Sequence, residues 1–254
     1  MGASVREVGP MEPLARPFKV CNRVYQVGGQ DMTSGNDCCV YLVDGRADTS
    51  LPGKAGHDMG PLALIDTGYG PSYKSIVANI LRLGFEPEGL ESALLTHCHI
   101  DHVGGAGLFR EDYHVILIAH EADAVPLESG DRMMTAAFLY NVKFSPLQID
   151  RKLSLEEEAF DIGNVRINVI HTPGHSPGSV AAYMDIEGFR VLFGQDIHGP
   201  FHPDLGSDLD LWRDSMQRLL ELDADILCEG HFGIYSPSSA VRAYIQSFLE
   251  RFAH

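Results

Sequence analysis

Short apolar runs, separated by turn residues, recur along most of this chain. Each run is a few residues long and rich in β-branched side chains, which is typical of buried strands. The stretch 44–60 is rich in Gly and Asp instead and predicts an exposed loop. The runs that predict strands lie at 23–27, 38–43, 62–65, 93–95, 113–119, 160–163, 165–170, 179–184, 190–193 and 226–228. Those between 160 and 193 follow one another closely and predict a meander.

Apolar residues at helical spacing mark a second kind of segment. The stretch 72–83 places Ile76 and Ile80 on one side and ends before Gly84, a residue type that commonly stops helices. Further helices are predicted from residue 121, over 210–222 and over 238–252. Because the strands bunch together with helices between some of them, the pattern predicts an α/β fold in which two sheets pack face to face with helices outside.

The stretch 129–152 follows neither pattern. It crowds large apolar side chains, among them Met133, Phe138, Tyr140 and Phe144, with little periodicity. One interpretation is a core helix in which methionine fills gaps. The other is an inserted cap that supplies an apolar wall to a substrate pocket, with Phe138 and Tyr140 contacting the substrate.

The composition fits a globular protein with a strong negative charge. With 254 residues and 44% hydrophobic content, the chain is long enough for one large α/β domain or two small ones. The formal charge of -16 repels nucleic acid, so we expect no nucleic-acid partner. No apolar stretch approaches the roughly 20 residues that span a bilayer, so we expect no membrane partner. Residues 1–19 contain no apolar signal-peptide core, which favours a cytoplasmic protein.

One short loop, THCHIDHVGG at 96–105, holds three imidazoles and a carboxylate. Neutral imidazole and ionised carboxylate are the usual ligands of zinc and similar divalent ions. At a strand end, residues i and i+2 face the same way, so His97 and His99 can point at one metal ion. Asp101 and His102 follow after the chain turns, so they can face a neighbouring position. The loop therefore predicts a metal-dependent enzyme with more than one metal position.

Three further ligand candidates lie far away in the sequence, each at the end of a predicted strand. They are His175 in HTPGHSPGS, Asp196 in FGQD and His231 in EGHFG. Strand ends at one edge of a sheet bring distant residues together, so we expect these three to complete the site that the loop begins.

Taken together, these motifs resemble those of the metallo-β-lactamase superfamily. The pattern HxHxDH is followed by a His in TPGHSPGS, an Asp in GQD and a late GH, and Asp66-Thr67-Gly68 precedes them all. The resemblance implies a four-layer αβ/βα sandwich, in which two mixed β-sheets carry helices on their outer faces. It also implies that residues 1–254 form a single domain with the metal site at one edge.

The resemblance further implies how the ligands divide between two metal ions. The metals would be two divalent ions, with Zn2+ as the first choice and Mn2+ or Fe2+ as alternatives. Each ion would keep open positions for water and substrate. The implied ligands are His97, His99 and His175 for the first metal, Asp101, His102 and His231 for the second, Asp196 as a bridge between them, and Asp66 as support behind the site.

The motifs look most like the glyoxalase II, thioesterase and lactonase branches of this superfamily. These branches imply hydrolysis of a small ester, lactone or thioester, in which a hydroxide shared by the metals attacks the carbonyl and Asp101 orients it or takes its proton. The chain departs from some lactonases, which carry Tyr where Gly199 stands. It also departs from glyoxalase II enzymes, which usually carry a basic cluster for glutathione near the C-terminus, because its tail holds only Arg242 and Arg251. Mononuclear-iron persulfide dioxygenase chemistry, and phosphodiesterase or β-lactamase activity at the same site, remain alternatives.

The residues that follow Asp196 are candidates for contacting the substrate. His198 and His202 flank Gly199-Pro200-Phe201, so we expect them to line the pocket. The substrate is expected to be a small molecule, and a homodimer is compatible with the negative charge.

Overall fold

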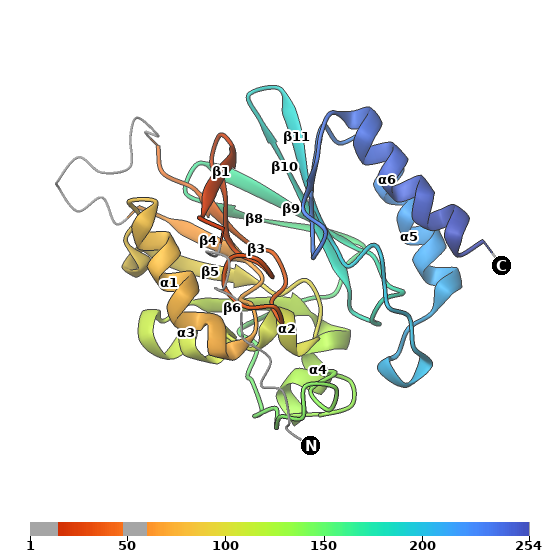
Figure 1. Ribbon diagram of the computed structural model, residues 1–254, viewed down its shortest axis with the longest axis horizontal. Helices are drawn as coiled ribbons and strands as arrows, with labels where there is room; N and C mark the ends of the chain where they lie inside the picture. The colour runs from red at the N-terminus through yellow and green to blue at the C-terminus, as the bar shows by residue number, and fades with distance from the viewer. Residues whose placement is uncertain (1–14, 48–59, 254) are drawn as a thin grey trace, which may run out of the picture.

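The computed structural model describes residues 15–47 and 60–253, whose strands form two sheets (Figure 1). Most of the N-terminal stretch 1–19 and of the predicted loop 44–60 therefore lies outside the described residues. The first sheet has the order β1 (Phe18–Cys21), β2 (Val24–Gly28), β3 (Val40–Asp44), β4 (Leu62–Ile65), β5 (Leu90–Leu94), β6 (Ile116–His120) and β7 (Arg151–Leu153). The second has the order β13 (Ile234–Tyr235), β12 (Ile226–Glu229), β11 (Phe189–Gln195), β10 (Val180–Ile186), β9 (Val165–His171) and β8 (Glu157–Ile162).

Both sheets mix parallel and antiparallel pairs. In the first sheet, β1 to β4 pair antiparallel, whereas β4 to β7 pair parallel. In the second sheet, β8 to β11 form the antiparallel meander that the sequence predicts, and β12 joins β11 in parallel. Because parallel neighbours need a crossover connection, helices lie between the strands of each parallel stretch.

Helices cover the outer face of each sheet (Figure 1). The first sheet carries α1 (Tyr73–Arg82), α3 (Ala106–Tyr113) and α4 (Glu121–Ser129), and the second carries α5 (Leu209–Glu221) and α6 (Ser238–Arg251). Shorter pieces are α2 (Ile100–Val103) and the 3-10 turns η1 (Gly70–Ser72), η2 (Pro87–Gly89) and η3 (Pro203–Leu205). The order helices, sheet, sheet, helices confirms the predicted four-layer α/β sandwich with two mixed sheets.

The buried side chains form three layers, one between the sheets and one beneath each set of helices. In β9, Val165, Ile167 and Val169 are buried between the sheets while the residues between them are more exposed, the period-two pattern of a strand with one face in the core. In α5, Trp212 and Met216 lie one turn apart and are fully buried. Burial of each such side chain contributes about 1.5–3 kcal/mol. This packing holds the strand ends at fixed positions.

Three short strands were not predicted from the sequence, and several strand starts differ by up to three residues. The unpredicted strands are β1, β7 and β13, which contain 4, 3 and 2 residues. The strand expected from residue 113 begins at Ile116, because Tyr113 still belongs to α3. His114 has a left-handed backbone (φ 59°), which ends that helix.

The stretch 129–152 contains no helix beyond the end of α4, so the core-helix interpretation is wrong. Gly130 turns the chain with a φ of 70°, and the carboxylate of Asp131 then accepts the backbone N–H of Met133 at 2.8 Å in place of a helical bond. The segment lies against the His-rich loop, since the carbonyl of Thr135 accepts the N–H of Ile100 at 2.9 Å. Its role as a cap stays a prediction.

Within residues 15–47 and 60–253, no helix has the length and apolar character that crossing a bilayer requires. α6 has 14 residues, whereas a spanning helix needs roughly 20. The cytoplasmic location stays a prediction.

Candidate metal centre

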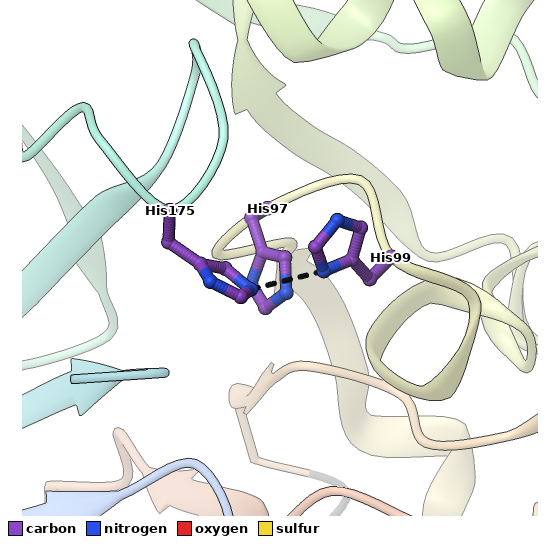
Figure 2. Close-up of side chains that lie close together, drawn as sticks. All are labelled: His97, His99 and His175. Atoms are coloured by element: carbon purple, nitrogen blue, oxygen red, sulfur yellow. Dashed lines mark hydrogen bonds between the residues drawn. The ribbon is translucent and has the colours of Figure 1, made fainter. Parts of the chain in front are cut away.

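The first group of predicted ligands comes from two loops that are far apart in the sequence. His97 and His99 lie in the loop after β5, and His175 lies in the loop between β9 and β10 (Figure 2). Nε2 of His175 lies 3.0 Å from Nδ1 of His99. The ring centroid of His97 lies 4.6 Å from that of His99 and 4.7 Å from that of His175. The structure thus brings the three buried imidazoles together.

The second group forms beside the first. Asp101 and His102 lie on the short helix α2, and His231 follows β12. Nε2 of His231 lies 3.2 Å from Oδ2 of Asp101 and 3.2 Å from Nε2 of His102. These are the three residues that the sequence motifs assign to a second metal.

Asp196 stands between the two groups, directly after β11. Its Oδ2 lies 3.5 Å from Nε2 of His175 and 3.4 Å from Nε2 of His231. Its Oδ1 lies 3.2 Å from Nε2 of His102. Gly230 is required here, because a Cβ at that position would come within 2.1 Å of Oδ1. One carboxylate therefore faces both groups, the position predicted for a bridging ligand.

The donor atoms fit a divalent metal. Nε2 of His97 is buried, has no hydrogen-bond partner among the described residues and lies 4.0 Å from Oδ2 of Asp196. A buried polar atom without a partner costs free energy, and a metal ion would remove that cost. Imidazole nitrogens with carboxylate oxygens are a donor set that zinc and related ions accept.

Burial keeps the first group unprotonated. It lowers the pKa of His97 well below its usual value, with His102 and His99 adding repulsion. It lowers the pKa of His175 to about 3, again with the neighbouring His99 contributing. The neutral imidazole is the form that binds a metal. This group can therefore accept a cation without losing protons first.

The second group holds its protons more tightly. Burial opposes the charged form of His231, but the carboxylates of Asp196 and Asp101 raise its pKa to about 10. Burial also opposes ionisation of Asp196, but His231 and His102 hold its pKa well below the usual value. Without metal, positively charged imidazole neutralises the carboxylates here. A divalent ion would take over that positive charge and release protons.

Asp66 supports the site from behind, where the sequence motifs predict it. Its Oδ2 lies 2.8 Å from Nδ1 of His102 and accepts the hydroxyl of Thr96 at 2.8 Å, while its Oδ1 accepts the N–H of Thr96. Its own backbone is left-handed (φ 62°), a strained conformation for a non-glycine residue. The carboxylate thereby holds Nδ1 of His102 and leaves Nε2 facing Asp196.

Asp123 is a second supporting carboxylate, and the sequence analysis missed it. Oδ2 accepts the N–H of Cys98 at 2.8 Å and the hydroxyl of Ser176 at 2.6 Å, and Oδ1 accepts the N–H of Gly178 at 2.7 Å. Cys98 lies between two predicted ligands, and Ser176 follows a third. The signal available in the sequence was an acid in the first turn of a helix that directly follows a strand.

The segment 129–152 places its two predicted substrate residues differently. Tyr140 stacks against Tyr69 with ring centroids 5.3 Å apart. Burial raises the pKa of Tyr140, and the nearby charge of Asp101 raises it further. Phe138 is half-buried within the turns of the segment. Substrate contact by either residue stays a prediction.

His198 and His202 also differ in their surroundings. Nδ1 of His198 lies 2.9 Å from the buried carboxylate of Glu229, and its ring centroid lies 5.3 Å from that of His231. His202 is exposed and accepts the N–H of Asp204 at the start of η3. His198 thus borders the metal centre, whereas the contacts of His202 are local.

Comparison with known proteins supports the same family. The model of the metallo-beta-lactamase superfamily matches residues 56–231. A Dictyostelium discoideum protein named Glyoxylase B2 is 32% identical over 162 residues, which are 58% of this chain and 50% of that protein. An N-acyl homoserine lactonase from Bacillus sp is 27% identical over 112 residues, 44% of this chain and 40% of the lactonase. The chain thus spans about half the length, or less, of these two relatives.

Solved structures show the same fold at lower identity. The native FEZ-1 metallo-beta-lactamase from Legionella gormanii superposes with a TM-score of 0.76 at 19% identity. The superposition covers 96% of this chain and 96% of that chain. The BJP-1 enzyme of Bradyrhizobium japonicum, a subclass B3 metallo-beta-lactamase, gives a TM-score of 0.73 at 23% identity, with 94% of this chain and 93% of that chain covered. Because the family model covers more than half of the chain, and because the His and Asp clusters imply a divalent metal, the chain belongs to the metallo-β-lactamase superfamily of metal-dependent hydrolases.

Proposed function

We propose that this protein hydrolyses a small ester, lactone or thioester at a centre of two divalent ions, with Zn2+ as the first choice. The observation that carries the proposal is the position of Asp196 between two groups of three side chains, 3.5 Å from His175 on one side and 3.4 Å from His231 on the other. Relatives named Glyoxylase B2 and N-acyl homoserine lactonase support this choice among hydrolases.

In this proposal His97, His99 and His175 would hold one ion, Asp101, His102 and His231 would hold the other, and Asp196 would serve both. When bound, the ions supply a nucleophilic hydroxide at neutral pH and polarise the carbonyl. Despite its burial, nearby imidazolium charges lower the pKa of Asp101 in the metal-free protein, and bound divalent ions would supply that positive charge in their place. The Asp101 carboxylate can therefore orient the attacking water and accept a proton.

We propose that the Tyr140 hydroxyl holds the carbonyl oxygen of the substrate. Its raised pKa keeps the hydroxyl protonated, so it acts as a hydrogen-bond donor beside Asp101. The Tyr69 ring against which it stacks limits its motion. We propose that this donor is directed at the substrate rather than at the metals.

The test is a hydrolysis screen with metal content measured on the same sample. The panel contains an aryl ester, a lactone, a thioester, a phosphodiester and a β-lactam. We expect two divalent ions per chain and hydrolysis of at least one of the first three. One iron per chain with oxygen consumption on a persulfide would overturn the proposal, as would activity confined to the phosphodiester or the β-lactam.

A further inference from the structure

A large aromatic cavity lies beside the metal centre, on the side of the second sheet. Its volume is about 810 Å³, and α6 and the loops that follow β11 and β12 line it. Most of the side chains that line it are aromatic, including Phe201, Phe232, Tyr244, Phe248 and Phe252. The charged side chain among them is Arg251, whose guanidinium lies 5.5 Å from the centroid of the Phe252 ring. The lining is therefore suited to an apolar group rather than to a polar peptide.

The cavity borders both groups of predicted metal ligands. His198 lines the cavity, and its ring centroid lies 5.3 Å from that of His231. Phe201 also lines it, 6.1 Å from the ring of His175. Two side chains that line the cavity thus also contact a proposed ligand, one in each group.

Glu229 holds this wall in place. It is fully buried, and its Oε1 lies 2.9 Å from Nδ1 of His198. Its Oε2 accepts the backbone N–H groups of His231 and Phe232 at 2.6 Å and 2.7 Å. One carboxylate thus fixes the loop of the proposed ligand His231, the backbone of Phe232 and the side chain of His198.

We propose that this cavity receives the apolar group of the substrate, so that the preferred substrates are esters or thioesters with an aryl or medium-length alkyl group. This inference rests on the proposed hydrolase function. Phe232 is 57% exposed beside the metal centre, and covering it with an apolar group would remove aromatic surface from water. An acetyl group would leave the cavity unfilled.

The fluorescence of Trp212 can report ligand binding without any catalytic turnover. It is the one tryptophan of the sequence and is fully buried. Its ring lies 5.0 Å from Phe201 and 5.6 Å from Phe252, both of which line the cavity. A ligand in the cavity should therefore change its fluorescence.

The experiment titrates the purified protein with phenylbutanamide and with butanamide and follows Trp212 fluorescence. We expect saturable binding of phenylbutanamide, with butanamide at least about tenfold weaker because it lacks the ring. Phe232→Ala should weaken phenylbutanamide binding about three- to tenfold. Phe189→Ala is the matched control, because Phe189 is equally exposed at 57% but lies at the far end of β11.

Equal binding of both amides would overturn the inference, as would unchanged binding in both Phe232→Ala and Phe248→Ala. Circular dichroism of each variant separates loss of the cavity from loss of the fold. Kinetics on acetyl and phenylbutanoyl thioesters then separate the two proposals. Amide binding without hydrolysis of any ester, lactone or thioester would reject the proposed function alone, whereas hydrolysis with no amide binding and no preference for the phenyl group would reject the cavity alone.

Discussion

Asp123 accepts a hydrogen bond from the backbone N–H of Cys98 at 2.8 Å, and thereby fixes the loop between His97 and His99. The same carboxylate binds Ser176 and Gly178, on either side of the turn after His175. Two loops that carry proposed ligands and come from different sheets are thus joined by one buried side chain. Their separation depends on this carboxylate rather than on either strand alone.

Replacing this carboxylate should weaken metal binding. In Asp123→Asn, an amide N–H replaces an acceptor oxygen and faces the N–H donors around it. We expect metal affinity to fall about 10- to 100-fold, as is typical when a group that orients ligands is lost. Calorimetric titration of chelator-treated protein with Zn2+ measures this. Asp150→Asn is the control, because Asp150 also accepts a backbone N–H, that of Leu117, away from the centre; an equal loss in both variants would contradict a specific role.

Removing a proposed ligand should abolish hydrolysis while the fold survives. We expect His97→Ala and Asp101→Ala each to lower kcat/KM by more than about a hundredfold, because each change removes a direct metal contact. The far-ultraviolet circular dichroism should stay close to that of the parent. His114→Asn, on the exposed turn after α3, should keep activity, since Asn tolerates the left-handed backbone there. Full activity in either ligand variant would sink the dinuclear mechanism.

The Tyr140 hydroxyl should matter for turnover but not for metal content. Tyr140→Phe keeps the ring that stacks on Tyr69 and removes only the proposed donor. We expect kcat/KM to fall about tenfold or more, with unchanged metal per chain.

Trimming Phe138 to Ala should alter the preference among acyl groups more than the metal content. If both variants hydrolyse every acyl chain with the same kinetics as the parent protein, the predicted cap is contradicted.

His120 should make the protein less stable in mild acid. Its ring stacks on that of His171 with centroids 3.8 Å apart, and burial, followed by the charge of His171, lowers its pKa below the usual 6.5. Below pH 6.5 the unfolded chain therefore binds a proton that the folded chain does not, so stability falls as the pH drops from 6.5 toward the folded pKa.

A single substitution isolates this contribution. His120→Asn keeps an acceptor for the N–H of Ala122 at the start of α4 and removes the titrating group. The free energy of unfolding, measured by urea denaturation at about pH 7.5 and about pH 5.5, should decrease less in the variant than in the parent. An identical decrease in both proteins would show that His120 does not carry the effect.

Much of the fold and the candidate site could be predicted from local sequence. The runs at 62–65, 165–170 and 226–228 lie within, or match, strands of the structure, because a buried strand leaves a short-range signature in side-chain type. The motifs also identified the six side chains that the structure clusters around Asp196. The stretch 129–152 could not be predicted in this way, since side-chain hydrogen bonds such as those of Asp131 decide its path.

The sequence by itself determined the α/β class, the position of the His-rich loop at a strand end and the residue types available to a metal. Only the tertiary structure decided which carboxylates hold those residues. Asp123 bonds to partners 25, 53 and 55 positions away, and Glu229 lies 31 positions from His198. Such contacts leave no periodic trace, because they form only when loops from both sheets meet. The aromatic cavity also depends on tertiary structure, since α6 and two separate loops must pack together before their aromatic side chains line it.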